Sequence, residues 1–298
     1  MRTFAAIAAI LLAGAGCVPT VFPLRTPAEE AAALLVRAGS TITLSESPLG
    51  LAGDWFQAFG HGNTRVVTLE RWELPHASLR WVSEEKIETE ASKRAREAFE
   101  ALPPAPVGEI APKPPEPAYD AVTRAGEAHA DDLDDGDGLL LPAAWTEGED
   151  VSRDGRTLLW LSRAQYDSLV ATRVATVRFG LFDEELAGAY EALAGFKSFI
   201  ESLNKDAPSS TGKPDFDAMH ADEQWGEYRL KVDGEEISVR TVQAGNWFAR
   251  IVVLANPENP LVLQVKLTPA AYGPDALLSP ATAFARSFGY EVVSITTK

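Results

Sequence analysis

A stretch rich first in proline and then in acidic residues, 103–138, limits what the rest of the chain can fold into. It has prolines up to Pro117, several aspartates from Asp131 onward, and few bulky apolar side chains. A segment of this kind cannot bury enough apolar surface to offset the entropy of ordering it. We therefore expect a linker, extended at its start because proline favours polyproline II, that divides the chain into two parts.

The part before this stretch, residues 26–102, mixes helix and strand patterns. Residues 26–29 (TPAE) predict a helix start, with a capping threonine, proline at the first helical position and a glutamate that closes a capping box. Alternating residues predict strands over 65–72 and 78–82. Residues 83–102 predict a charged helix, because their apolar side chains recur at helical spacing.

The part after the stretch, residues 139–298, repeats this mixture. A capping box at residues 162–165 predicts a short helix, and apolar spacing after Asp183 predicts a longer helix over 183–203. Ser279-Pro280 and Gly289 mark the start and end of a last helix over 279–288. The Asp-Gly pair at 233–234 predicts a hairpin turn between two alternating strands. Helices together with antiparallel hairpins indicate the α+β class, with helices packed on the sheets and two parts separated by the linker.

Residues 1–16 have the character of a secretory signal peptide. Arg2 gives a positive start, residues 4–13 are continuously apolar, and small residues follow up to Cys17. The apolar run is shorter than the roughly 20 residues that a helix needs to cross a bilayer. We expect a cleaved leader, followed by a tether over residues 17–25.

The end of this leader resembles the lipobox of bacterial lipoproteins. Ala15, Gly16 and Cys17 match the motif, whereas Gly14 stands where the family usually has leucine. The resemblance covers the leader alone. It implies cleavage before Cys17, lipidation of that cysteine and a lipid-anchored protein of the bacterial cell envelope. Val18 follows the cysteine, where an aspartate marks retention at the inner membrane in this family, so the resemblance favours the outer membrane.

A second cleavage site remains open. Ala13, Gly14 and Ala15 fit the A-x-A pattern of ordinary signal peptidase. Cleavage there would release a soluble periplasmic or secreted protein with a free thiol. Cys17 is the only cysteine in the sequence, and an unpaired thiol is unusual in an oxidising compartment. Lipidation removes this difficulty, and we favour it.

The net charge of −16 at pH 7 limits the partners of the protein. A strongly negative field repels phosphate backbones, so we expect no nucleic-acid partner. With its cysteine lipidated the protein has no disulfide, so its stability depends on the apolar core, to which 7 tryptophans and 13 phenylalanines can contribute. The expected partners are the membrane, through the lipid anchor, and a protein or an apolar ligand; no cofactor is expected.

The acidic run at residues 131–138 is a candidate calcium site, because calcium is bound by several carboxylate and carbonyl oxygens. Asp131 and Asp135 fit the spacing of an EF-hand loop, but Leu133 occupies the third position and a proline the twelfth. Asp131, Asp135 and Asp137 are therefore candidate metal ligands of a site no tighter than about millimolar. A solvated acidic run is the interpretation that we favour.

Three aromatic residues and one histidine are candidates for ligand binding. Trp55 and Phe56 lie together near a turn, Trp247 follows a Gly-Asn pair, and His61 lies between two glycines. Aromatic side chains can line a cleft for an apolar ligand, although core packing is their ordinary role. The sequence contains neither a G-x-S-x-G nucleophile elbow nor an HExxH metal pair.

These observations favour a lipid-anchored envelope protein that acts as a non-catalytic binding or assembly module. An envelope hydrolase with a carboxylate-based site is the alternative, because any two of the many carboxylates could form a catalytic pair. Calcium-dependent adhesion through residues 131–138 is a third hypothesis.

Overall fold

The structure is a computed structural model, and its fold is mostly β. Strands account for 53% of the described residues and helices for 13%. The predicted α+β class, with helices packed on sheets, is therefore wrong. The described residues are 34, 36–46, 64–102, 113–148, 150–152, 155–180, 217–247, 249–268 and 289–298.

Two α-helices lie within the described residues: α3 (Glu90–Glu100) and α4 (Arg163–Thr172). The helix predicted over 83–102 starts late, because residues 83–88 continue strand β3 (His76–Glu88). Cross-strand pairing there outweighs a helical spacing that rests largely on alanines. The short helix predicted by the capping box at Ser162 is confirmed as α4. The helices predicted over 183–203 and 279–288 lie outside the described residues.

Five strands close into a small barrel. They are β10 (Gly226–Val232), β11 (Glu235–Gly245), β12 (Ala249–Leu254), β13 (Val262–Leu267) and β14 (Tyr290–Thr296). Neighbours from β10 to β14 pair antiparallel in chain order, and a parallel pairing of β10 with β14 closes the ring. The predicted turn at Asp233-Gly234 joins β10 to β11, and both of its residues have positive φ.

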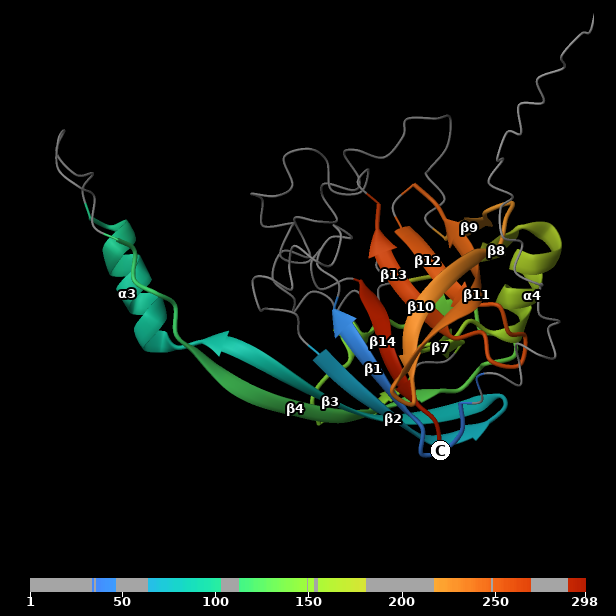
Figure 1. Cartoon of the computed structure of the whole chain (residues 1–298), viewed down its shortest axis with the longest axis horizontal. Helices are drawn as coiled ribbons and strands as arrows, with labels where there is room; N and C mark the ends of the chain where they lie inside the picture. The colour runs from blue at the N-terminus through green and yellow to red at the C-terminus, as the bar shows by residue number, and fades with distance from the viewer. Residues whose placement is uncertain are drawn as a thin grey trace, which may run out of the picture.

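The sheet continues out of the barrel in two directions (Figure 1). From β14 it extends through β1 (Thr41–Glu46), β2 (Thr64–Glu73), β3, β4 (Tyr119–Ala130) and β6 (Asp150–Ser152). From β11 it extends through β9 (Ala218–Ala221) and β8 (Val174–Thr176). A separate parallel pair, β5 (Gly138–Leu139) with β7 (Arg156–Thr157), and a 3-10 turn, η1 (Pro142–Ala144), complete the described elements.

About a third of the predicted linker is a structural strand. Within residues 103–138, β4 pairs with β3 along its full length of 12 residues. The acidic run after it is also ordered, because the carbonyl oxygens of Leu133 and Asp134 accept the N–H groups of Arg163 and Ala164 at the start of α4. One continuous sheet thus joins what we predicted as two parts separated by a linker.

Two long strands form an arm that projects from the body of the protein (Figure 1). The pairing of β2 with β3 starts at Thr64 and Glu84, whereas β3 and β4 continue to pair as far as Glu88 and Tyr119. The ribbon beyond Glu84 therefore extends past the end of β2, and it carries α3 at its tip. Within the described part of the chain, no helix is long and apolar enough to cross a membrane.

Candidate functional site

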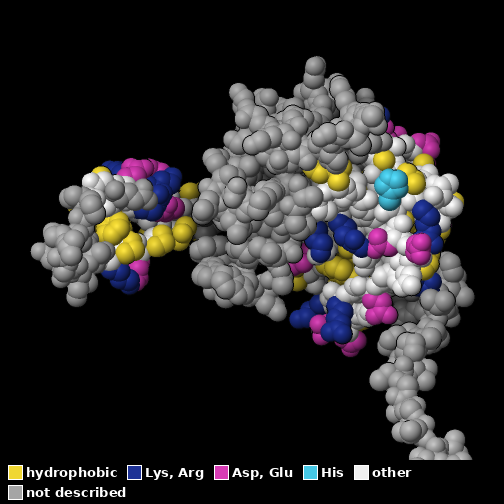
Figure 2. Space-filling view, turned by 90° about the horizontal axis from the view of Figure 1, so that it is seen from above, with side chains coloured by type: hydrophobic (Ala, Val, Ile, Leu, Met, Phe, Trp, Pro, Cys, Tyr) yellow, Lys and Arg dark blue, Asp and Glu magenta, His cyan; other side chains and the backbone are white. Residues whose placement is uncertain are grey.

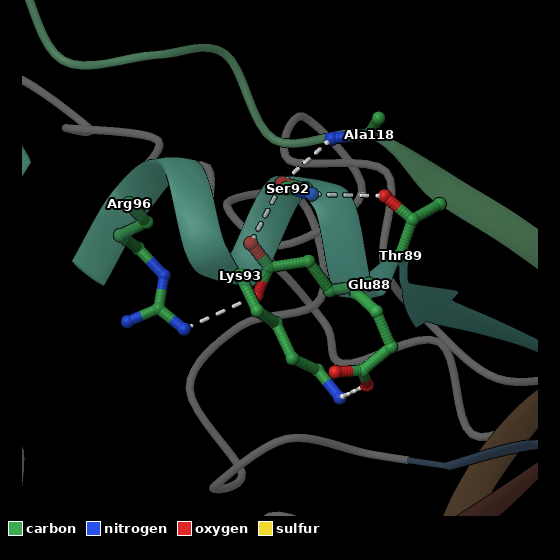
Figure 3. Close-up of polar contacts among 7 residues, drawn as sticks. Glu88, Thr89, Ser92, Lys93, Arg96 and Ala118 are labelled. Carbon is green, nitrogen blue, oxygen red and sulfur yellow. Dashed lines mark hydrogen bonds and ion pairs between the residues drawn. The ribbon is translucent and has the colours of Figure 1, made fainter. Parts of the chain in front are cut away.

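The arm ends in a helix that one serine ties to both strands (Figure 3). Thr89, the N-cap of α3, accepts a hydrogen bond at Oγ1 from the backbone N–H of Ser92 at 3.1 Å. The Ser92 hydroxyl donates to Glu88 Oε1 at 2.8 Å and accepts from the backbone N–H of Ala118 at 3.1 Å. Because Glu88 ends β3 and Ala118 precedes β4, these bonds fix the orientation of the helix on the arm.

Two ion pairs hold the charged side chains at this junction. Arg96 Nη2 lies 3.3 Å from Glu88 Oε2, and Lys93 Nζ lies 2.7 Å from Glu90 Oε1. The hydrogen bond from Ser92, followed by that from Arg96, lowers the pKa of Glu88. The hydrogen bond to Glu90 raises the pKa of Lys93. The pair of Arg96 with Glu88 orients α3 on β3, whereas the pair of Lys93 with Glu90 lies within the first turn of the helix.

Apolar side chains of the arm remain exposed. Leu102, just past the end of α3, is 54% exposed, and Ile87 and Tyr119 at the base of the helix are exposed as well. Residues spaced by three or four lie on one face of a helix, and the exposed alanines of α3 share the face of Leu102: Ala91, Ala95 and Ala98. Figure 2 shows hydrophobic side chains side by side on the arm, bordered by charged ones. This surface suits contact with another macromolecule.

The second candidate site is the loop of residues 222–225 between β9 and β10. β9 pairs with β11 at Ala244 and Gly245, whereas β10 pairs with β11 only as far as Thr241. Both lie on the edge of β11 opposite β12. The loop therefore leaves the edge of β11 beside Val242 and Gln243. Two adjoining hollows lie between the loop and the sheet there.

The two hollows share the segment from Ala221 to Trp225. The first lies against α4 and the barrel and is also lined by Leu169, Val170, Arg173 and Val242. The second is also lined by Gly226 and Gln243. The floor of the first is apolar, because Leu169 and Val242 are buried. Its exposed rim is mixed, with polar Glu223 and Gln224 beside apolar Val170 and Trp225.

A polar network fixes the loop to the sheet. The carboxylate of Asp222 pairs with Arg250, whose guanidinium also donates to Gln243 Oε1 at 2.9 Å. The backbone of Asp222 is held as well, because its N–H donates to the Gln243 carbonyl at 2.8 Å and its carbonyl accepts from the Arg173 side chain. A loop held at both its backbone and its side chain presents its remaining groups in a fixed arrangement.

Trp225 is the most unusual residue of this loop. Its side chain is 46% exposed, and the guanidinium carbon of Arg240 lies 5.5 Å from its ring centroid. This cation–π contact holds the indole from one side. An exposed indole in a polar hollow can stack on a flat ligand while the neighbouring side chains form hydrogen bonds to it.

The candidate calcium ligands do not converge. Asp137 pairs with Arg178 at 3.1 Å and Asp131 lies 3.7 Å from His76 Nδ1. The backbone N–H of Asp135 donates to the Asp132 carboxylate, an Asx-type turn. Nowhere in the described ranges do three or more His, Cys, Asp or Glu side chains gather in a group that could hold a metal ion.

The remaining predicted residues contribute little to these sites. Trp247 is half-buried and packs against the apolar core, and its carbonyl accepts a hydrogen bond from Thr268. Cys17, Trp55, Phe56 and His61 lie outside the described residues, so lipidation and ligand binding at those positions remain predictions.

Sequence reasoning missed both the arm and the loop. Residues 222–225 (DEQW) place a tryptophan at the end of a polar run, immediately before a strand. An aromatic residue in a polar loop was a signal that could have identified this site. Comparison with protein-family models, with curated proteins and with solved structures finds no match for this chain.

Proposed function

We propose that the protein is a non-catalytic assembly module of the bacterial cell envelope, which is lipid-anchored through Cys17 and binds a partner protein through its projecting arm. The arm is the observation that carries this proposal. A two-stranded ribbon that extends past its sheet buries little apolar surface of its own, so a contribution to the stability of the barrel does not explain its length.

The tip of the arm supports a role in binding. Arg96 of α3 pairs with Glu88 of β3, which orients the helix, while Leu102 and the alanines of the helix remain exposed. Burial of such apolar groups against a complementary groove is a common mode of helix recognition. The net charge of −16 favours a protein partner over an anionic polymer.

The proposal is tested by shortening the arm in the full-length protein. Glu84 and Thr123 are directly opposite each other in the sheet, so residues 85–122 can be replaced by a two-residue Asn-Gly turn. We expect the shortened protein to keep its melting temperature and membrane fractionation but to lose its complex on a native gel of solubilised membranes. Leu102→Glu, a single change at the tip, should give the same loss.

The matched control is Val170→Glu, since Val170 is an exposed apolar residue on α4 of the body. This variant should keep the complex, because α4 lies away from the arm (Figure 1). A complex of unchanged size in both the shortened protein and Leu102→Glu would contradict the role of the arm.

A further inference from the structure

We propose that the loop of residues 222–225 is a binding site for a neutral saccharide, whose ring stacks on Trp225 and whose hydroxyl groups bind the polar side chains of the loop. This site lies on the body of the protein and not on the arm. Its function does not depend on the assembly role proposed above.

The indole of Trp225 is presented for stacking. It is 46% exposed although it is a large apolar group, and it lines both hollows of the loop. Arg240 holds it through the cation–π contact at 5.5 Å. The C–H groups on one side of a sugar ring carry a partial positive charge, which suits the negative face of an aromatic ring.

Groups that can bind hydroxyls surround the indole. Glu223 and Gln224 line both hollows and are exposed, and Gln243 lines the second. Carboxylate and amide side chains supply acceptors and donors in pairs, which matches the adjacent hydroxyls of a sugar. The network of Asp222, Arg250 and Gln243 fixes the loop before a ligand arrives, so little entropy is lost on binding.

The charges of the site favour a neutral ligand. Three guanidinium groups, those of Arg173, Arg240 and Arg250, oppose the binding of a cation. All three already have partners in the loop. Arg173 donates to the Asp222 carbonyl, Arg240 lies against the Trp225 ring, and Arg250 pairs with the Asp222 carboxylate. An anion is opposed by Glu223 and by the net charge of −16. The polar side chains of Glu223 and Gln224, which line both hollows, disfavour a purely apolar ligand, because its burial would leave them without hydrogen-bond partners.

The test is calorimetric titration of the full-length protein with three neutral trisaccharides: triacetylchitotriose, cellotriose and maltotriose. Deacetylated chitotriose and trigalacturonate serve as the cationic and anionic comparators. We expect at least one neutral trisaccharide to bind with a dissociation constant below about 10 mM, and more tightly than either charged comparator. Trp225→Ala should weaken that binding about tenfold or more, and Trp225→Phe should weaken it less, because a ring is retained.

Tyr119→Ala is the matched control, since Tyr119 is an exposed aromatic residue on the arm. It should leave the affinity for the trisaccharide unchanged. Circular dichroism and the melting temperature establish that each variant is folded.

The proposal is overturned if no neutral trisaccharide binds at about 10 mM, if a charged comparator binds more tightly, or if folded Trp225→Ala binds as well as the native protein. Shortening the arm should not affect any of these affinities, so failure of one proposal is distinguishable from failure of the other.

Discussion

The guanidinium carbon of Arg65 lies 4.6 Å from the ring centroid of Trp81 on the neighbouring strand. The same guanidinium carbon lies 5.4 Å from the ring centroid of Trp145, the residue that follows η1. The guanidinium also donates a hydrogen bond to the carbonyl of Pro142. Arg65 is only 6% exposed. It therefore joins the segment after β5 to the inner face of β2 and β3, and its long side chain provides both packing and charge.

Substitution of Arg65 should show which of these contributions matters more. We expect Arg65→Ala to lower the free energy of unfolding by about 3 kcal/mol, because it removes the packing against two indoles and the donor to Pro142. Arg65→Met keeps most of the packing and should lower it by about 1 kcal/mol. Denaturant unfolding monitored by tryptophan fluorescence measures both. Equal losses in the two variants would show that the charge, and not the packing, dominates.

Gly126 of β4 leaves room for the ring of Trp81 on the opposite strand. A Cβ atom at this position would lie 2.8 Å from the Trp81 ring and 3.0 Å from the carbonyl oxygen of Thr146. Gly126→Ala should therefore destabilise the protein by about 1–3 kcal/mol, the usual cost of overpacking. Thr123→Ala, on an exposed position of the same strand, should change the melting temperature little. A melting temperature of Gly126→Ala equal to that of the native protein would contradict this account.

Gly126 also shows why the sequence concealed β4. Strand patterns are recognised by bulky or β-branched residues, but β4 contributes mostly alanine and glycine to the space beneath Trp81 and its neighbours. The alanines and glycine that leave room for Trp81 give β4 a composition that is also typical of a linker. The prolines before the strand and the aspartates after it reinforced that interpretation, although Leu133 among the aspartates is buried.

Local features were easier to predict than long-range pairing. The capping box at Ser162 and the Asp233-Gly234 turn involve neighbouring residues, and both are confirmed. The closure of the barrel depends on β10 meeting β14, which is distant in sequence, and no periodicity predicts such a pairing. The loop site depends on β9 and β10 sharing one edge of β11. It was therefore beyond the reach of a sequence pattern as well.

The lowered pKa of Glu88 predicts how the arm responds to acid. A carboxylate with a lowered pKa in the folded state stabilises its contacts fully above the ordinary glutamate pKa, and this stabilisation is lost as the pH falls below that value. We expect the contacts of α3 with β3 to weaken in that acidic range.

Titration of the Glu88 carboxyl by NMR should show the lowered pKa. Ser92→Ala and Arg96→Ala should each raise it towards the ordinary value, because each removes a hydrogen bond to the Glu88 carboxylate. Titration of Glu88 at the ordinary value in the native protein would contradict the contacts drawn in Figure 3.

The proposed anchor predicts a change of fractionation. In a bacterial host with the lipoprotein pathway, the protein should be in the membrane fraction and Cys17→Ser in the soluble fraction, because the serine lacks the thiol that accepts the lipid. Intact-mass analysis of the mature protein checks this directly, since an N-terminus at Cys17 with added acyl mass is expected. A mature chain that starts at Gly16 and carries no acyl mass would instead support cleavage after the A-x-A site.

Calcium should have little effect on the stability of the protein. The carboxylate of Asp137 is paired with Arg178, that of Asp132 accepts a hydrogen bond within the turn, and Asp131 lies beside His76. A calcium ion would have to compete with these contacts, so we expect a dissociation constant no tighter than about millimolar. At a calcium concentration equal to that constant the stabilisation is only about 0.4 kcal/mol, which corresponds to a shift of about 1 °C in the melting temperature.

Thermal unfolding with calcium and with EGTA should therefore give nearly the same midpoint, and Asp135→Ala should leave the difference unchanged. Micromolar binding in a calorimetric titration, abolished by Asp135→Ala, would show that the acidic run rearranges around the ion and would restore calcium-dependent adhesion as a function for this segment.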